Sequence, residues 1–97
     1  MKFTAKISWL SALEGGRTNA IPFNTGKYAP LIRVKGSSGN WSLVVNNYER
    51  VDHITTIAMI YYLVPESAPN NLAVGLKFDL YEGNKRVAFG EIIDEAD

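Results

Sequence analysis

Apolar side chains recur at every second position in short segments of this 97-residue chain. In the segment Phe3–Trp9 every odd-numbered residue is apolar, and the residues between them are Thr, Lys and Ser. Residues 76–81 alternate in the same way, with Leu76, Phe78 and Leu80 on one face. A period of two places these side chains on one face of a β-strand, whereas a helix needs a period of 3.6. The chain is therefore expected to fold as strands that each turn one face to a shared core.

Four further segments are expected to be strands, and two turns join neighbouring strands into hairpins. Residues 36–40 are only Gly, Ser and Asn, which favour turns. In the turn 82–85, Gly83 and Asn84 tolerate the positive φ that tight hairpins need. The most apolar segment, 54–64, is rich in β-branched and aromatic residues and is followed by Pro65, which favours a strand over a helix. The four strands are 31–35, 41–45, 54–64 and 85–93.

Six short antiparallel strands around one core predict an all-β fold, a small six-stranded closed antiparallel β-barrel formed by residues 1–97 as a single domain. Closure would also leave no strand edge exposed. Residues 10–30, rich in Gly, Asn, Thr and Pro, are expected to be a long loop of the kind that often carries function. Residues 65–71 form a second connector, and the acidic residues 94–97 are expected to be a frayed tail.

The two halves of the sequence carry opposite charge, although the formal net charge is zero. Residues 1–50 contain seven Lys or Arg and two Glu, whereas residues 51–97 contain three Lys or Arg and eight Asp or Glu. Nonspecific nucleic-acid binding needs a basic patch or stripe. Such a patch would survive if the fold kept the halves apart, but in a closed barrel we expect them to interleave.

The residues that carry most catalytic chemistry are scarce in this chain. It contains no cysteine and a single histidine, His53, so disulfides, thiolate zinc sites and cysteine nucleophiles are excluded. A metal site would need His53 with carboxylates, yet the adjacent Asp52 would point to the opposite face of a strand. Spacing leaves a Ser-His-Asp triad open, but there is no Gly-x-Ser-x-Gly turn and no phosphate-binding loop for nucleotide hydrolysis. We therefore expect neither an enzyme nor a cofactor.

The N-terminal segment does not have the pattern of a signal peptide, because Lys6 interrupts its apolar region. The longest apolar stretch, 54–64, is too short to span a bilayer. Together with the absence of cysteine, these features predict a cytoplasmic protein with no membrane partner.

The run Glu14-Gly-Gly-Arg17 in the long loop is a candidate anion-binding site. Two glycines allow consecutive backbone N–H groups to face an anion, and Arg17 would add a bidentate contact. A simple turn is the commoner explanation of the same residues. Aromatic side chains would indicate base stacking only if they were exposed beside basic residues.

Three motifs follow one another along nearly the whole chain. They are Glu14-Gly-Gly-Arg-Thr18, then Gly26-Lys-Tyr-Ala-Pro30 before a strand that carries Arg33, and finally GLKFDLYEGNKRVAFG at 75–90. In their order and rough spacing they resemble the C-terminal β-barrel domain of elongation factor Tu and its relatives. That domain is a six-stranded closed barrel that does no chemistry. The resemblance therefore implies the same fold and a non-catalytic role.

In that family the domain contacts the acceptor and T-stem side of aminoacyl-tRNA, the factor's other domains and its exchange factor. The resemblance places Arg17, Thr18, Glu82 and Gly83 near the tRNA backbone. The match is incomplete, since the family has a histidine at the position of Thr18 and a glycine at that of Asn84, and 46–52 replaces a Pro-Gly-Asp turn. A free-standing domain of this kind would present only part of the tRNA surface, so weak intrinsic affinity is expected.

Two hypotheses of function follow. The first is a protein-interaction or regulatory module with an unidentified protein partner, which mimics the translation factor's domain or neutralises a protein that attacks it. The second is a tRNA- or RNA-binding module that uses Arg17, Lys27, Arg33 and Lys35. A contiguous basic face that includes Arg17 and Arg33 would favour RNA, whereas a patchwork or apolar face would favour a protein.

Overall fold

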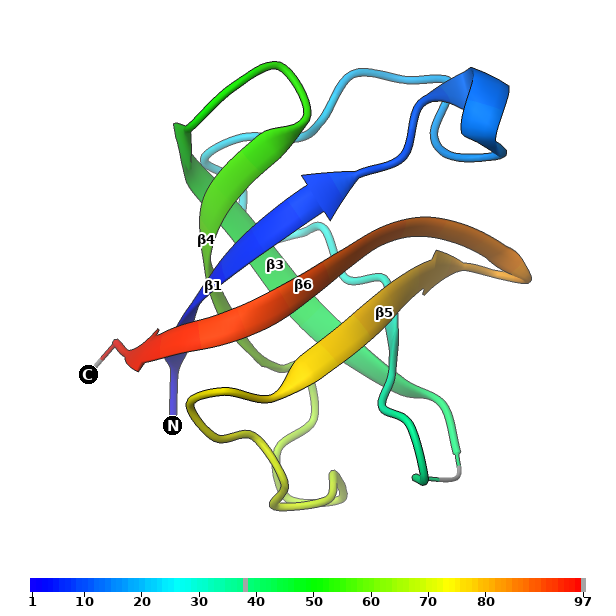
Figure 1. Cartoon of the computed structure of the whole chain (residues 1–97). Coiled ribbons are helices and arrows are strands. Elements are labelled where there is room, and N and C mark those ends of the chain that lie inside the picture. The colour runs from blue at the N-terminus through cyan, green and yellow to red at the C-terminus, as the bar shows by residue number, and fades with distance from the viewer. Residues whose placement is uncertain (38, 97) are drawn as a thin grey trace.

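The computed structural model describes residues 1–37 and 39–96, and these residues form a closed antiparallel β-barrel (Figure 1). Around the barrel the strands follow the order β1-β4-β3-β2-β5-β6, and β6 pairs with β1. The predicted all-β, six-stranded barrel is confirmed. In this part of the chain no helix is long and apolar enough to cross a bilayer. The elements are β1 Phe3–Trp9, a 3₁₀ helix η1 Ala12–Glu14, β2 Leu31–Arg33, β3 Trp41–Arg50, β4 Thr55–Tyr62, β5 Lys77–Glu82 and β6 Lys85–Glu95.

The inner faces of the strands meet in one apolar core. In β1 the four odd-numbered residues are at most 4% exposed, as the alternation predicts. Phe78 and Leu80 of β5 are buried as well, and Leu76 packs against the core from just before the strand. Burying each large aliphatic side chain stabilises the fold by roughly 1.5–3 kcal/mol. The core comprises Phe3, Ala5, Ile7, Trp9, Ile32, Leu43, Val45, Ala58, Ile60, Tyr62, Phe78, Leu80, Val87, Ala88 and Ile92.

Two irregularities in the pairing of β6 explain why some of its side chains do not alternate between the inner and outer faces of the barrel. Between β5 and β6 the register jumps from Leu80↔Ala88 to Tyr81↔Arg86, so Val87 has no opposite residue. Val87 and Ala88 are therefore both buried although they are adjacent in sequence. Between β1 and β6 a similar jump leaves Ile93 unpaired, and its side chain is 45% exposed. An extra residue of this kind bends a strand and redirects its side chains.

Two strands extend beyond their predicted ends. β3 continues through residues 46–50, because Asn47 is buried and hydrogen-bonded inside the barrel instead of forming a turn. The expected frayed tail is wrong for Asp94 and Glu95, which belong to β6 and pair with Thr4 and Phe3 of β1. The tail prediction for Asp97 lies outside the described residues. The two ends of the chain therefore lie side by side (Figure 1).

The hairpins predicted from the turn residues are present. β2 pairs with β3, and β5 pairs with β6 through the register Glu82↔Lys85. In the second turn only Gly83 takes a positive φ, of 63°, while Asn84 does not. In the first turn Gly36 and Gly39 have positive φ, and the prediction for Ser38 lies outside the described residues.

The long loop 10–30 covers an edge that the short strand β2 leaves open. β2 pairs with only two residues of β3, so the rest of that edge needs other partners. Backbone carbonyls of Tyr28 and Pro30 accept hydrogen bonds from the N–H groups of Val45 and Leu43, at 3.0 and 2.9 Å. Further along, Phe23 forms an isolated parallel bridge with Asn47. The loop thus protects an edge that would otherwise invite pairing with another chain.

A chain of buried polar groups holds this loop to the barrel. The indole Nε1 of Trp9 donates to Oγ1 of Thr56 at 2.8 Å, and that hydroxyl donates to Oδ1 of Asn47 at 2.7 Å. The amide of Asn47 then donates to the carbonyl of Pro22 at 2.8 Å. Thr56 and Asn47 are fully buried, so losing one partner would leave another polar group without a hydrogen bond.

The two glycines after η1 have different requirements, which gives a matched pair of variants. A Cβ at Gly16 would lie 2.1 Å from the carbonyl oxygen of Leu10, whereas a Cβ at Gly15 would meet open space. Gly15 has a φ of 83°, and a residue with a Cβ can adopt this φ at the cost of modest backbone strain. We expect Gly16→Ala to lower the free energy of unfolding by about 3 kcal/mol and Gly15→Ala by about 1 kcal/mol, measured by urea denaturation. Equal losses would contradict the close approach at Gly16.

Candidate functional site

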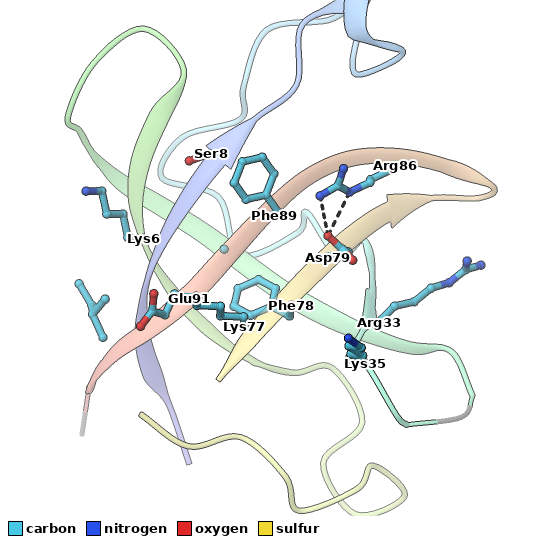
Figure 2. A pocket seen from close by; sticks show the side chains of 12 residues that line it. Lys6, Ser8, Arg33, Lys35, Lys77, Phe78, Asp79, Arg86, Phe89 and Glu91 are labelled. Carbon is cyan, nitrogen blue, oxygen red and sulfur yellow. Dashed lines mark hydrogen bonds and ion pairs between the residues drawn. The ribbon is translucent and has the colours of Figure 1, made fainter. Parts of the chain in front are cut away.

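A groove crosses the outer face of four neighbouring strands, β1, β6, β5 and β2 (Figure 2). It has a volume of about 460 Å³, and we call it the basic groove. Beside it, a second hollow shares Arg33, Lys35 and Asp79 with the groove and continues toward Asn40. The depression therefore runs from β1 to the turn before β3. The basic groove is lined by Lys6, Ser8, Arg33, Lys35, Lys77, Phe78, Asp79, Arg86, Phe89, Gly90, Glu91 and Ile93.

The strand register arranges the lining side chains in two rows across the sheet. One row runs from Arg33 on β2 to Asp79 on β5, Phe89 on β6 and Ser8 on β1. A second row places Lys77 of β5 and Lys6 of β1 on either side of Glu91 of β6. Residues directly opposite each other in antiparallel strands are close enough for their side chains to interact.

Two arginines of the basic groove are held in place by their neighbours. The guanidinium of Arg86 forms an ion pair with Asp79, with Nη2 2.8 Å from Oδ1, and lies 5.2 Å from the centre of the Phe89 ring (Figure 2). The guanidinium of Arg33 lies 4.0 Å from the centre of the Tyr81 ring, and its Nε donates to Oδ1 of Asn40 at 3.2 Å. Stacking on an aromatic face orients an arginine while leaving other N–H groups able to bind a ligand.

The floor of the basic groove is apolar. A Cβ at Gly90 would lie 2.8 Å from Cζ of Phe78, so the ring of Phe78 fills the space beneath Gly90. Phe89 and Ile93, at different positions along β6, also line the basic groove and are 43% and 45% exposed. Large apolar side chains that are exposed together and rimmed by charge are typical of binding surfaces.

The charges of the chain are distributed unevenly around the barrel. The basic groove is lined by five Lys or Arg and two Asp or Glu, a net charge of +3. The rest of the chain therefore contains five Lys or Arg and eight Asp or Glu, a net charge of −3. Basic residues from both halves of the sequence meet here, so the halves interleave while a basic region persists.

The structure divides the predicted binding residues between two places. Arg33 and Lys35 line the basic groove, whereas Arg17 and Glu82 contact each other at the β5–β6 turn that contains Gly83. Thr18 is exposed in the long loop. Lys27, the fourth cation of the RNA hypothesis, is also exposed in this loop and does not line the groove.

Sequence reasoning did not select the other residues of the basic groove, notably Lys6, Lys77, Arg86 and Phe89. The alternation of β1 and β5 already places Lys6 and Lys77 on the outer face. The alternation does not predict the strand register, which brings the outer faces of β1, β6 and β5 together. The outward position of Phe89 follows from the irregular pairing at Val87, which no local pattern reveals.

Arg17 is engaged in contacts within the protein. Its guanidinium forms an ion pair with Glu82, donates to the carbonyl of Ala20 at 3.1 Å and lies 5.0 Å from the centre of the Tyr28 ring. Its side chain is only 15% exposed. The N–H groups of Gly15 and Gly16 donate to the carbonyls of Ala12 and Ser11, so they are directed into a turn. These contacts account for the Glu-Gly-Gly-Arg run as a structural feature.

The hydroxyl of Tyr28 completes this cluster by donating to Oε2 of Glu82 at 2.6 Å. Burial of the phenol, and secondarily its hydrogen bond to Glu82, raise the pKa of Tyr28 well above its usual value. Elsewhere, within residues 1–37 and 39–96, no group of three His, Asp or Glu side chains is placed to hold a metal ion. His53 is exposed, and its carbonyl accepts a hydrogen bond from Arg50.

No protein-family model matches the chain, and no curated protein matches its sequence. The resemblance to the elongation factor Tu domain therefore stays a prediction based on the three motifs.

The contacts of Arg17 and Arg33 predict different effects on stability. Arg17→Ala leaves Glu82 without its partially buried partner, and we expect the free energy of unfolding to fall by about 2 kcal/mol. Arg33→Ala removes an exposed arginine, and we expect a change of about 0.5 kcal/mol or less. Thermal and urea unfolding of the two variants measure this difference. An unchanged stability of Arg17→Ala would show that the ion pair contributes little.

The raised pKa of Tyr28 predicts a loss of stability in alkali. Above pH 10.0, its ordinary value, the tyrosine ionises in the unfolded chain while it stays protonated in the folded protein. The unfolded state then binds fewer protons, so the free energy of unfolding falls as pH rises above about 10. We expect Tyr28→Phe to make this fall shallower in urea unfolding between pH 9 and about 11. The same slope in both proteins would contradict this role of Tyr28.

Proposed function

We propose that this protein is a non-catalytic protein-interaction module that binds its partner through the basic groove. The observation that carries the proposal is the combination of an apolar floor with side chains of both charges. Fully desolvated aromatic and arginine side chains at the centre of an interface supply most of its binding energy. Phe89 with Arg86 in contact with its ring provides such a set, and Ile93 and Arg33 line the same groove.

The distribution of charge supports a protein partner over a nucleic acid. Asp79 and Glu91 lie among the cations, where they would repel a phosphate backbone. The zero net charge of the chain provides little long-range attraction for a polyanion. Arg17 and Arg33 do not form one continuous basic face, since Arg17 is paired with Glu82 away from the basic groove.

RNA binding is the second candidate, and a specific observation favours it. Five Lys or Arg side chains line the groove that also holds the exposed ring of Phe89, and a base can stack on such a ring while cations contact its phosphates. Phe89 is already in contact with Arg86, which makes one face of the ring less accessible.

The resemblance to the elongation factor Tu domain supports a link with translation. Under this proposal the protein regulates by engaging a partner of that factor, or by neutralising a protein that attacks it. The barrel then acts as a copy of a surface already recognised by other proteins, without any reaction of its own.

Capture from a lysate of the host tests the proposed function. We expect the tagged protein to retain a defined protein after ribonuclease treatment. Phe89→Ala should reduce the retained amount about tenfold, because an aromatic side chain at the centre of an interface commonly contributes more than 1 kcal/mol. Leu13→Ala is the matched control, since Leu13 is a fully exposed apolar residue outside the basic groove.

Two results would contradict the proposed function. Retention that disappears with ribonuclease, together with recovery of tRNA or other RNA, would favour the second candidate. Equal losses with Phe89→Ala and Leu13→Ala would place the docking surface elsewhere. Thermal unfolding of both variants beforehand establishes that each is folded.

A further inference from the structure

We propose that a second pocket, at one end of the barrel, binds a small organic acid that consists of a single carboxylate on an apolar body. The pocket lies where the end of β1, the long loop and the turn between β3 and β4 come together (Figure 1). We call it the mouth pocket; its volume is about 370 Å³, and it shares no lining residue with the basic groove. The residues that line it include the apolar Trp9, Ile21 and Ile54 and the basic Arg17, Arg50 and His53.

The first argument is the apolar surface of the mouth pocket. Trp9 is a buried core residue at the end of β1, and its N–H donates to the carbonyl of Ile54 at 2.7 Å, which fixes the β3–β4 turn beside it. Ile21 of the long loop packs against the core, while the side chain of Ile54 is exposed. Binding sites for small molecules are concave and mostly apolar, and the mouth of a β-barrel is a common place for them. The pocket therefore suits a ligand with an apolar body.

The second argument is the position of Arg50. In the register of β3 and β4 it is opposite the buried Thr56, so its side chain lies on the inner face of the sheet, at the mouth of the barrel. Its Nη1 donates to the carbonyl of His53 at 3.2 Å, and its guanidinium lies 4.9 Å from the centre of the Phe23 ring. These two contacts orient the guanidinium and leave other N–H groups able to bind a carboxylate.

The third argument is the charge of the mouth pocket. No Asp or Glu lines it. Arg17 is neutralised by its ion pair with Glu82, whereas within residues 1–37 and 39–96 no carboxylate forms an ion pair with Arg50. One arginine without an acidic partner matches one carboxylate, and a phosphate dianion would bring a charge more than the pocket offsets.

Acidic residues next to the mouth pocket are engaged or turned away. Oδ1 of Asp52 accepts the N–H of Ile54 at 3.0 Å, and Oε1 of Glu14 accepts the N–H of Ser11 at 2.9 Å. Glu49 is opposite Ile57, one position from the inward Thr56, and therefore lies on the outer face of the sheet. The basic side of the pocket thus remains open to an acid from outside the chain.

Arg17 gives a further reason to expect a ligand with a hydrogen-bond acceptor. Its Nη1 and Nη2 contact Glu82 and the carbonyl of Ala20, but its Nε is buried and has no acceptor in the part of the chain that the structure describes. Buried N–H groups are normally paired. This wall of the mouth pocket therefore favours a ligand that supplies an acceptor over one that is wholly apolar.

Closure of the barrel favours a free small acid over the end of a peptide. Peptides commonly bind by pairing their main chain with an exposed strand edge. Each of the six strands already has a partner on both sides, so the barrel offers no such edge. The affinity has to come from the carboxylate and the apolar body alone.

Titration of the ¹⁵N-labelled protein with 3-phenylpropionate tests this inference by NMR. 3-Phenylpropionamide has the same apolar body without the charge, and propionate has the same charge without the ring. We expect 3-phenylpropionate to shift amide signals of residues around the mouth pocket. It should bind about fivefold more tightly than either control, because neither the carboxylate nor the ring suffices alone.

Substitution of Arg50 provides the complementary test. We expect Arg50→Gln to bind 3-phenylpropionate about fivefold more weakly and 3-phenylpropionamide as the unaltered protein does. A loss of structure would instead weaken the binding of both compounds. Arg33→Gln is the matched control, since Arg33 is an exposed arginine outside the mouth pocket, and it should change neither affinity.

Four results would overturn the inference. They are equal binding of 3-phenylpropionate and its amide, equal effects of Arg50→Gln and Arg33→Gln, shifts outside the mouth pocket, and tighter binding of phenyl phosphate. Tighter binding of acetyl-Ala-Phe with a free carboxylate would overturn the assignment to a free small acid. None of these measurements involves Phe89, so the proposed function of the basic groove is decided separately by the capture experiment.

Discussion

Closure of the barrel depends on β1, whose two edges are paired with strands from distant parts of the chain. On one side it pairs with β4 and on the other with β6, so it joins the first residues to the last. Without that seam the sheet would have two open edges and the core would be exposed from one side. The seam also places the outer faces of β1, β6, β5 and β2 next to one another. The basic groove exists because the barrel closes there.

The barrel combines a buried apolar core with a surface whose charges come from separate segments. Lys6, Arg33 and Lys35 belong to the basic first half of the sequence, and Lys77 and Arg86 to the acidic second half. Interleaving of the strands brings them to one face. Since the chain is neutral as a whole, this local excess is balanced by acidic residues elsewhere on the surface. A neutral chain with a local excess of this kind exerts little long-range attraction on polyanions.

Local sequence patterns predicted much of the fold, and they failed where a contact between residues far apart in the chain determined the conformation. The alternation in β1 and β5 and the hairpin turn at Gly83 were read correctly because each depends on neighbouring residues. The predicted strand ends at Val45, yet Asn47 stays in β3 because Thr56 and Pro22 satisfy its amide. Asp94 reads as part of a solvated tail, yet it pairs with Thr4 at the opposite end of the chain.

By itself the sequence determined the all-β class, the inward faces of β1 and β5, and the absence of cysteine chemistry. These follow from residue type and from a side-chain period of two, which act over a few neighbouring positions. Only the tertiary structure decided which outward residues share a surface. Register and irregular pairing set that choice, and they couple residues such as Lys6 and Glu91 that are far apart in the chain. For the same reason only the structure separated Arg17, which is paired with Glu82, from Arg33, which lines the basic groove.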